Sequence, residues 1–270
     1  MVTQEQRKRQ LAREKFLRQQ QRRTAARRKA RMRNSAIASV LGVIVIGSVA
    51  LYTTNAFKSD DTSNASADVT PSASASKPVD PCEKAAKGSV KKLTWKKQPA
   101  QTIDTSAKYT MKLATTCGDI DIALKPSAAP HTVNSFDFLA GKGYFDHTKC
   151  HRLTTNGIYV LQCGDPTGTG SGGPGYTIPD ENLKDKSLKG NVYPAGTVAM
   201  ANAGKNTGGS QFFLVYQDSQ LSPNYTPFGT VSASGLKVLK KIAAAGENTG
   251  AGDGAPNATV VINKATVTKS

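Results

Sequence analysis

The sequence is poor in the residues that build large apolar cores and metal sites. Only 38% of its 270 residues are hydrophobic, and it has one tryptophan, four cysteines and three histidines. This apolar content is low for a chain that is globular from end to end, so part of it must lie outside a core. The histidines, His131, His147 and His151, lack zinc-ligand spacing to the cysteines, so we expect no metal ion and no cofactor.

Two chemical motifs lack the context that they need. Residues 168–173 match GxGxxG, but Pro174 and Pro179 follow at once, so no helix opens there and the segment is predicted to be a loop. Ser210, in GGSQF, lacks the second glycine of a nucleophile elbow. Neither motif therefore supports a dinucleotide-binding enzyme or a serine hydrolase.

Positive charge is concentrated at the start of the chain. The formal net charge is +17, but residues 1–34 hold 13 of the 36 Lys and Arg residues against two acidic ones. We treat residues 1–35 as a basic cytoplasmic arm. It could form a helix on anionic lipid or touch nucleic acid, but we favour a flank that only orients the next segment, with no nucleic-acid partner.

Residues 36–57 carry no charge and follow this basic block directly. The stretch is just long enough to cross a bilayer and has no polar face, so we predict a transmembrane helix with the N-terminus in the cytoplasm. A cleaved signal peptide, a twin-arginine signal, a lipoprotein or a buried core helix are the alternatives. We prefer an uncleaved anchor, because the basic region is too long for an ordinary signal peptide.

Two segments separate this span from the folded domain. Residues 58–81 are rich in Ser, Ala and Asp and almost free of large apolar groups, which predicts a flexible tether. Residues 82–108 have mixed character and contain Trp95, so we expect an extension that packs on the domain that follows.

The remaining residues, 109–270, show many short strands and two helices. Alternating apolar residues on either side of Cys117 and Gly118 predict a hairpin, and helices are expected at Pro130 to about Gly141 and about Gly235 to Ala245. The fold class is therefore mainly β. We expect a closed eight-stranded antiparallel barrel capped by two helices, since closure removes exposed strand edges.

Three segments carry a family resemblance. They are CHRLTTNGIYVLQCGDPTGTGSGGPGY, GTVAMANAGKNTGGSQFFLV and PFGTV, and MANAGKNTGGSQFF is the most specific. With these motifs the chain resembles the cyclophilin family of peptidyl-prolyl cis/trans isomerases from about Tyr109 to the end, in a membrane-anchored, actinobacterial-like form.

The chain departs from the common pattern at four places. The hairpin between Arg152 and Gln162 is two residues longer than in eukaryotic members, and Tyr159-Val160 replaces the usual Phe-Met pair. Gln220 stands where many members have a tryptophan that contacts cyclosporin, and Tyr225 where histidine is common. These changes put cyclosporin sensitivity and substrate preference in doubt.

The resemblance implies roles for individual residues. Arg152 would be the catalytic cation at the twisted amide, and Gln162 would bond the substrate backbone and orient Arg152. The proline pocket would be lined by Tyr159, Val160, Phe213 and Leu221. The main chain of Ala201 and Asn202 would pair with the substrate backbone, and Tyr225 would lie at the rim of the pocket.

These roles define an expected function. We expect a monomeric isomerase that accelerates X-Pro rotation in exported or cell-envelope proteins, held by residues 36–57 in the cell membrane with its catalytic domain outside the cytoplasm. Its partners would be proline-containing polypeptides. The alternative is a catalytically weak peptide-binding or chaperone module of the envelope.

Four cysteines outside the cytoplasm allow three full disulfide pairings. Cys150 and Cys163 lie on the two arms of the 152–162 hairpin at nearly equal distances from its tip. We hypothesise a bridge between them, with Cys82 to Cys117 as the second; reduced, buried thiols are the alternative.

Overall fold

A computed structural model of the chain describes residues 80–270. Its elements, in chain order, are β1 (Tyr109–Thr115), β2 (Gly118–Leu124), α2 (Pro130–Gly141), β3 (Thr148–Lys149), β4 (Arg152–Thr154), β5 (Val160–Cys163), the short 3-10 helix η1 (Lys189–Asn191), β6 (Val192–Tyr193), β7 (Thr197–Met200), β8 (Phe212–Val215), β9 (Ser219–Gln220), β10 (Pro227–Val231), α3 (Ala233–Ala244), β11 (Asp253–Gly254) and β12 (Val261–Lys269). Strands dominate, which confirms the predicted class.

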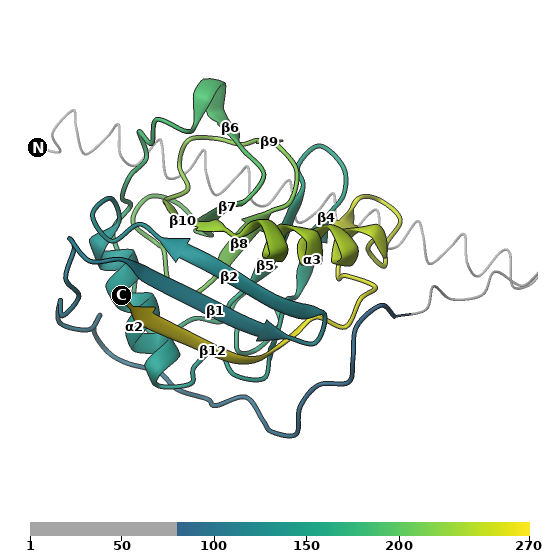
Figure 1. Ribbon diagram of the computed structural model, residues 1–270, viewed down its shortest axis with the longest axis horizontal. Helices are drawn as coiled ribbons and strands as arrows, with labels where there is room; N and C mark the ends of the chain where they lie inside the picture. Colours follow the sequence, from purple (N-terminus) through teal and green to yellow (C-terminus); the bar gives the residue numbers. More distant parts are fainter. Residues whose placement is uncertain (1–79) are drawn as a thin grey trace, which may run out of the picture. The chain divides into compact units, whose positions relative to one another are not determined.

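The hairpin β1–β2 lies within the main sheet. Met111 and Leu113 of β1 are fully buried, while Lys112 between them faces outward, as the period-2 pattern predicts. β1 pairs with β2 on one side and β12 on the other, both antiparallel. The polypeptide thereby brings its last strand beside the first strand of the domain (Figure 1).

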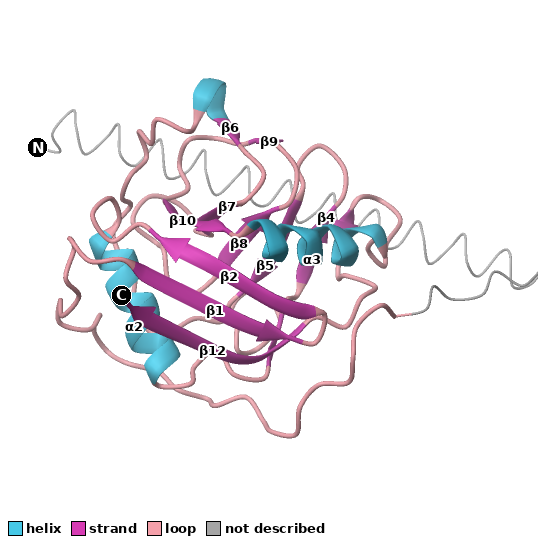
Figure 2. Cartoon of the chain, in the orientation of Figure 1, coloured by secondary structure: helices cyan, strands magenta, loops and turns pink. Residues whose placement is uncertain are grey.

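Ten strands form one sheet in the order β11-β4-β5-β8-β7-β10-β2-β1-β12-β3, and β6 pairs separately with β9. Figure 2 shows the main sheet curled, with α2 and α3 lying against it. Helix α2 packs on β12 and α3 on β2. The arrangement is a curled half-barrel with two helices.

The closed eight-stranded barrel that the sequence predicted is not shown. Within residues 80–270 no ladder joins β11 to β3, the two ends of the strand order. The extra strands are β3 and β11, each only two residues long, which add one member at either end of a set of eight. Strand β3 lies at one end of the strand order and β4 next to the other end, and only Cys150 and His151 separate them in the sequence. The chain therefore passes from one end of the sheet to the other without a hydrogen-bonded ladder between β3 and β4.

The two helices begin for different reasons. Helix α2 starts with Pro130 at its first position, and the carboxylate of Glu181 accepts the N–H groups of His131 and Thr132 at 3.0 and 2.9 Å. A negative charge is stabilising at a helix N-terminus, so this remote residue caps the helix. Helix α3 starts two residues before the predicted Gly235, because Ser232 caps it by accepting the Gly235 N–H.

Aromatic rings fill the space between α2 and the sheet. Phe136 of α2 lies 5.3 Å from Phe145, 5.5 Å from Phe212 and 4.6 Å from Phe228, measured between ring centroids. All four side chains are fully buried. Each such ring removes a large apolar surface from water, so this cluster is a principal source of stability in the domain.

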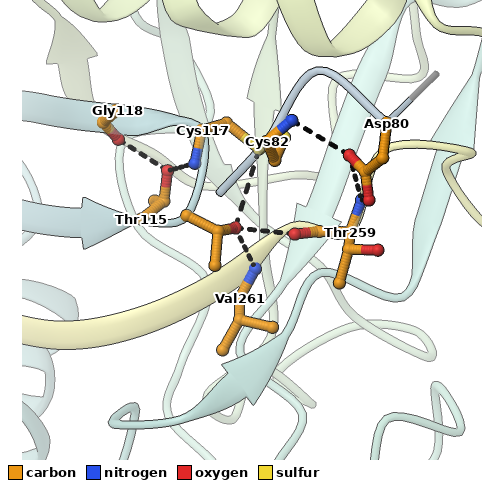
Figure 3. The surroundings of a disulfide bond; sticks show 8 residues. Asp80, Cys82, Thr115, Cys117, Gly118, Thr259 and Val261 are labelled. Atoms are coloured by element: carbon orange, nitrogen blue, oxygen red, sulfur yellow. Dashed lines mark hydrogen bonds between the residues drawn. A yellow bond between two sulfur atoms is a disulfide. The ribbon is translucent and has the colours of Figure 1, made fainter. Parts of the chain in front are cut away.

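The extension 82–108 is joined to the domain at its start by a disulfide between Cys82 and Cys117. Figure 3 shows Asp80 beside this bond, where its carboxylate accepts the N–H groups of Cys82 and Thr259. The beginning of the extension is therefore held covalently to the β1–β2 turn and by hydrogen bonds to the segment before β12.

Farther along, Trp95 anchors the extension. Its ring makes an edge contact with Phe138 of α2 at 5.1 Å and a tilted contact with Tyr144 at 5.9 Å. The backbone N–H of Trp95 donates to the carbonyl of Pro174 at 2.8 Å. Trp95 thus joins the extension both to α2 and to the glycine-rich loop that follows β5.

Among residues 80–270 no helix is both long and apolar enough to cross a bilayer. The basic arm, the expected membrane span at residues 36–57 and all but the end of the tether lie outside the described residues.

Candidate active site

The candidate site begins with pairing across four strands. Arg152 of β4 pairs with Gln162 of β5, Gln162 pairs with Phe213 of β8, and Phe213 pairs with Ala199 of β7. Directly opposed residues in antiparallel strands place their side chains on the same face. The structure therefore brings a cation, an amide and an aromatic ring into one row.

The neighbouring residues on these strands face the opposite way. Leu153, Leu161, Phe212 and Leu214 belong to the main core, between the sheet and the helices. The row on the other face adjoins a second apolar cluster, made of Val160, Tyr193, Ala199, Phe213 and Val215. The period-2 alternation of side chains thus separates the core face of the sheet from the site face.

Arg152 has an anionic partner that the sequence did not indicate. Its Nε and Nη2 atoms donate to the two carboxylate oxygens of Asp253, at 2.7 and 2.8 Å. This two-point contact lowers the pKa of Asp253 and raises the pKa of Arg152, because each charge stabilises the other. Both groups are ionised at neutral pH, and the guanidinium plane is fixed.

A chain of side-chain amides continues from the guanidinium. Arg152 Nη1 donates to Gln162 Oε1 at 3.1 Å, and Gln162 Nε2 donates to Gln211 Oε1 at 2.9 Å. Gln211 in turn donates to the carbonyl of Gly172 at 2.9 Å. Gln162 therefore orients Arg152, as the family resemblance implied, and Gln211 orients Gln162.

The guanidinium keeps donors for a substrate. It has five N–H groups, of which two bond Asp253 and one bonds Gln162. Within the described part of the chain this leaves one N–H on each Nη atom. The Arg152 side chain is 38% exposed, so these donors are accessible from solvent.

The apolar part of the site surrounds Phe213. Val160 is buried beside it, Leu221 and Tyr225 are partly buried against the same cluster, and the Tyr225 ring meets the Phe213 ring edge-on at 5.4 Å. Ala201 borders this cluster as well. Asn202 is partly exposed, and its side chain donates to the carbonyl of Asn224 at 2.7 Å.

Tyr159 is the one expected pocket residue that the structure places elsewhere. It packs against the main core, with its ring 5.9 Å from that of Tyr216. Tyr159 directly precedes β5, and its neighbours Ile158 and Val160 belong to the second apolar cluster instead. The structure therefore does not bring Tyr159 together with Phe213, and its place in the proline pocket stays a prediction.

The glycine-rich loop after β5 is organised by Asp165, another residue that the sequence reasoning did not single out. Its fully buried carboxylate accepts the N–H groups of Thr167, Thr169, Gly170 and Gly172 at 2.7 to 3.1 Å. Burial raises its pKa, but the hydrogen bonds outweigh burial and lower the pKa to about 2. An Asp followed by Pro, Thr and Gly is a turn signal that could have indicated this role.

A disulfide lies beside the row of Arg152, Gln162 and Phe213. It joins Cys150, two residues before Arg152, to Cys163, the residue after Gln162. The Cys150–Cys163 pair is the one that the symmetry of the hairpin suggested. The bond connects the segment just before β4 to β5, so it limits slippage of one strand past the other.

Comparison with known proteins defines the class. A profile of the family described as cyclophilin type peptidyl-prolyl cis-trans isomerase/CLD matches residues 110–267, well over half of the chain. The chain therefore belongs to the cyclophilin-type family.

Individual relatives agree with this assignment. A probable peptidyl-prolyl cis-trans isomerase B of Mycobacterium leprae is 52% identical over 164 residues, which are 58% of this chain and 56% of that protein. Peptidyl-prolyl cis-trans isomerase B of Bacillus subtilis is 44% identical over 126 residues, 46% of this chain and 82% of the relative. The chain thus spans little more than half the length of the mycobacterial protein.

A solved structure shares the fold. The cyclophilin type peptidyl-prolyl cis-trans isomerase of Cryptosporidium parvum is 27% identical, with a TM-score of 0.51. The likeness covers 60% of this chain and 99% of the Cryptosporidium chain.

The ionised state of Asp165 should make a measurable contribution to stability. Because its folded pKa is near 2, below the ordinary 3.8, this contribution is present above about pH 4 and is lost as the pH falls towards 2. Asp165→Asn should lower the free energy of unfolding by about 2 kcal/mol at pH 7. Urea titrations at several pH values measure this.

The matched control is Asp218→Asn, which replaces an exposed carboxylate that accepts one backbone N–H, from Ala195. It should change stability much less at pH 7. An Asp165→Asn effect that stays the same at pH 2 and pH 7 would contradict the assignment.

Proposed function

We propose that this chain is a peptidyl-prolyl cis/trans isomerase, using the row of Arg152, Gln162 and Phe213. The proposal is supported by family membership, by relatives named as such isomerases, and above all by the meeting of these three side chains on one sheet face. Proline-containing polypeptides would be the substrates, and the chain would act as a monomer.

The chemistry requires no nucleophile. Rotation about an X-Pro bond faces a barrier of about 18 to 20 kcal/mol, because amide resonance is lost as the bond twists. A catalyst lowers this barrier when it binds the twisted amide better than either planar form. Hydrogen-bond donors that are already oriented do this most effectively, since little reorganisation is needed in the transition state.

Arg152 would supply these donors. Asp253 and Gln162 hold its guanidinium from two sides, and the N–H groups that remain would bond the carbonyl oxygen before the proline or the prolyl nitrogen as it becomes pyramidal. Gln162 lies beside it and would contact the substrate backbone, so the polar half of the site would act on the twisting bond.

The apolar half would hold the proline ring. Phe213 forms the base of this pocket with Val160, and Leu221 and Tyr225 border it. The main chain of Asn202, with that of Ala201, would pair with the peptide. The bond from the Asn202 side chain to Asn224 favours a fixed backbone at this position.

A second candidate is a peptide-binding module with little turnover. One observation favours it: the contact with Asp253 neutralises the Arg152 charge and occupies two of its donors. Arg152 then has less free charge with which to stabilise the twisted amide. In the isomerase, Asp253 would orient Arg152, whereas in the binding module it would inhibit catalysis by Arg152.

We place the catalytic domain outside the cytoplasm, where it would act on exported or envelope proteins. The support comes from the uncharged segment 36–57 behind the basic arm and from the two disulfides, which persist in oxidising compartments.

Arg152→Ala should lower the catalytic efficiency of the full-length protein roughly 10²- to 10³-fold, equivalent to about 2.7 to 4 kcal/mol, because a preorganised donor at the twisting bond is lost. Peptide affinity should fall much less. Arg152→Lys should also fail, since an ammonium group cannot reproduce the planar fork. A coupled proline-isomerisation assay measures turnover.

Phe213→Ala is the comparison variant. It should weaken both binding and turnover, because the proline ring occupies the pocket in every state of the bond. If Arg152→Ala is folded and retains turnover within a few-fold of the parent, the role assigned to Arg152 is wrong.

Asp253→Asn tests the orienting role. The amide keeps one acceptor but loses the second oxygen and the charge, so kcat should fall about 10-fold while KM changes little. A rise in kcat would show that Asp253 restrains Arg152, and it would favour the binding module.

Topology can be tested in cells from which the wall has been removed. Protease added outside should digest the chain beyond about Ser59, while a tag placed at the N-terminus should remain protected. Protection of the folded domain would refute the external location.

A further inference from the structure

A cleft of about 1160 Å³ lies beside the candidate site and extends away from it. One part of its wall is made by residues of the proposed site and their support, Gln162, Ala201, Asn202 and Gln211. Phe213 does not line it, so the cleft is not the proline pocket. A polypeptide bound with its proline at Phe213 would have a continuous path into this space.

The other part of the wall comes from the extension. Lys96, Lys97 and Gln98 line the cleft together with the glycine-rich loop 170–177, beside which the extension runs. These three residues lie outside the family match, which begins at residue 110. The extension thus adds a wall that the family domain by itself does not supply.

This wall is held on both sides. Before it, the backbone N–H of Trp95 donates to the carbonyl of Pro174. The Trp95 backbone also lies so close to Gly175 that a Cβ there would be 2.7 Å from the Trp95 carbonyl oxygen. After it, Thr102 donates its N–H to the side-chain oxygen of Asn134 at 2.9 Å. The lysines therefore stand at defined places along the cleft.

The charge of the cleft has one sign. Lys96 and Lys97 are exposed, and among the described residues no carboxylate lines the cleft. The nearby Asp165 points into its own loop and is fully buried there. The remaining lining residues are glycines and small or neutral polar groups, so the two ammonium groups determine the electrostatic preference.

We propose that Lys96 and Lys97 form a specificity subsite that selects polypeptide segments carrying an Asp or Glu a few residues away from the isomerised proline. The inference rests on the proposed function, because the cleft would be reached by a chain already bound at Arg152 and Phe213. The ammonium groups attract the carboxylate without taking part in rotation of the X-Pro bond.

The test uses two sets of three peptides that share one Xaa-Pro core. In the first set the flanking positions before the proline are Glu, Ala or Lys, and in the second set the flanking positions after it are Glu, Ala or Lys. For the full-length parent, one of the two sets should give catalytic efficiencies about 5-fold higher for Glu than for Lys. The difference should shrink in 0.5 M salt, as expected for exposed charges with a short screening length.

The variants Lys96→Glu/Lys97→Glu and Lys96→Gln/Lys97→Gln should respectively reverse and abolish this preference. The Ala peptide should be turned over as well as by the parent. The matched control is Lys84→Glu/Lys87→Glu, which changes the same charge on exposed residues of the same extension that do not line the cleft. It should keep the preference for Glu.

Peptide affinity, measured by fluorescence anisotropy, separates the two proposals. If no peptide is turned over but the Glu peptide still binds more tightly and the Lys96→Glu/Lys97→Glu variant reverses this, isomerisation fails and the subsite stands. Equal efficiency and affinity for Glu and Lys peptides in the parent would overturn the subsite, as would a control variant that loses the preference equally.

Discussion

The register of β4, β5, β8 and β7 determines which side chains meet at the site. It sets Arg152, Gln162 and Phe213 in one row on the face opposite the main core. A shift of one residue between β4 and β5 would turn Arg152 and Gln162 to opposite faces. The Cys150–Cys163 bond lies beside the Arg152–Gln162 pair and joins the segment before β4 to β5. The same register of β4 on β5 therefore positions both the disulfide and the side chains of the site.

Charge compensation divides the electrostatics of the site into two parts. At the proposed catalytic site, the charge of Asp253 balances that of Arg152, so Arg152 would act through its directed N–H groups rather than through a long-range field. Along the cleft, Lys96 and Lys97 have no carboxylate among the residues described as lining it, so their field extends into the space where a chain would lie. Orientation of the amide and attraction of the surrounding chain would then be carried by different residues.

Local patterns predicted much of this arrangement. Alternation indicated the β1–β2 hairpin, Pro130 marked the start of α2, and the motifs located Arg152 and Gln162. Asp253 could not be found in this way, because it lies 101 residues from Arg152, in the two-residue strand β11, which has no recognisable sequence pattern. The surroundings of Tyr159 could not be predicted either, because it lies in the longer hairpin just before β5, where strand alternation does not determine which cluster it packs against.

Trp95 is the chain's only tryptophan, and it is packed where the extension meets α2 and the glycine-rich loop. Its indole is therefore the single strong intrinsic fluorophore of the molecule, immediately before Lys96 in the sequence. The emission spectrum should report whether the extension is docked, without any attached label. The molecule carries its own optical probe at the edge of the cleft.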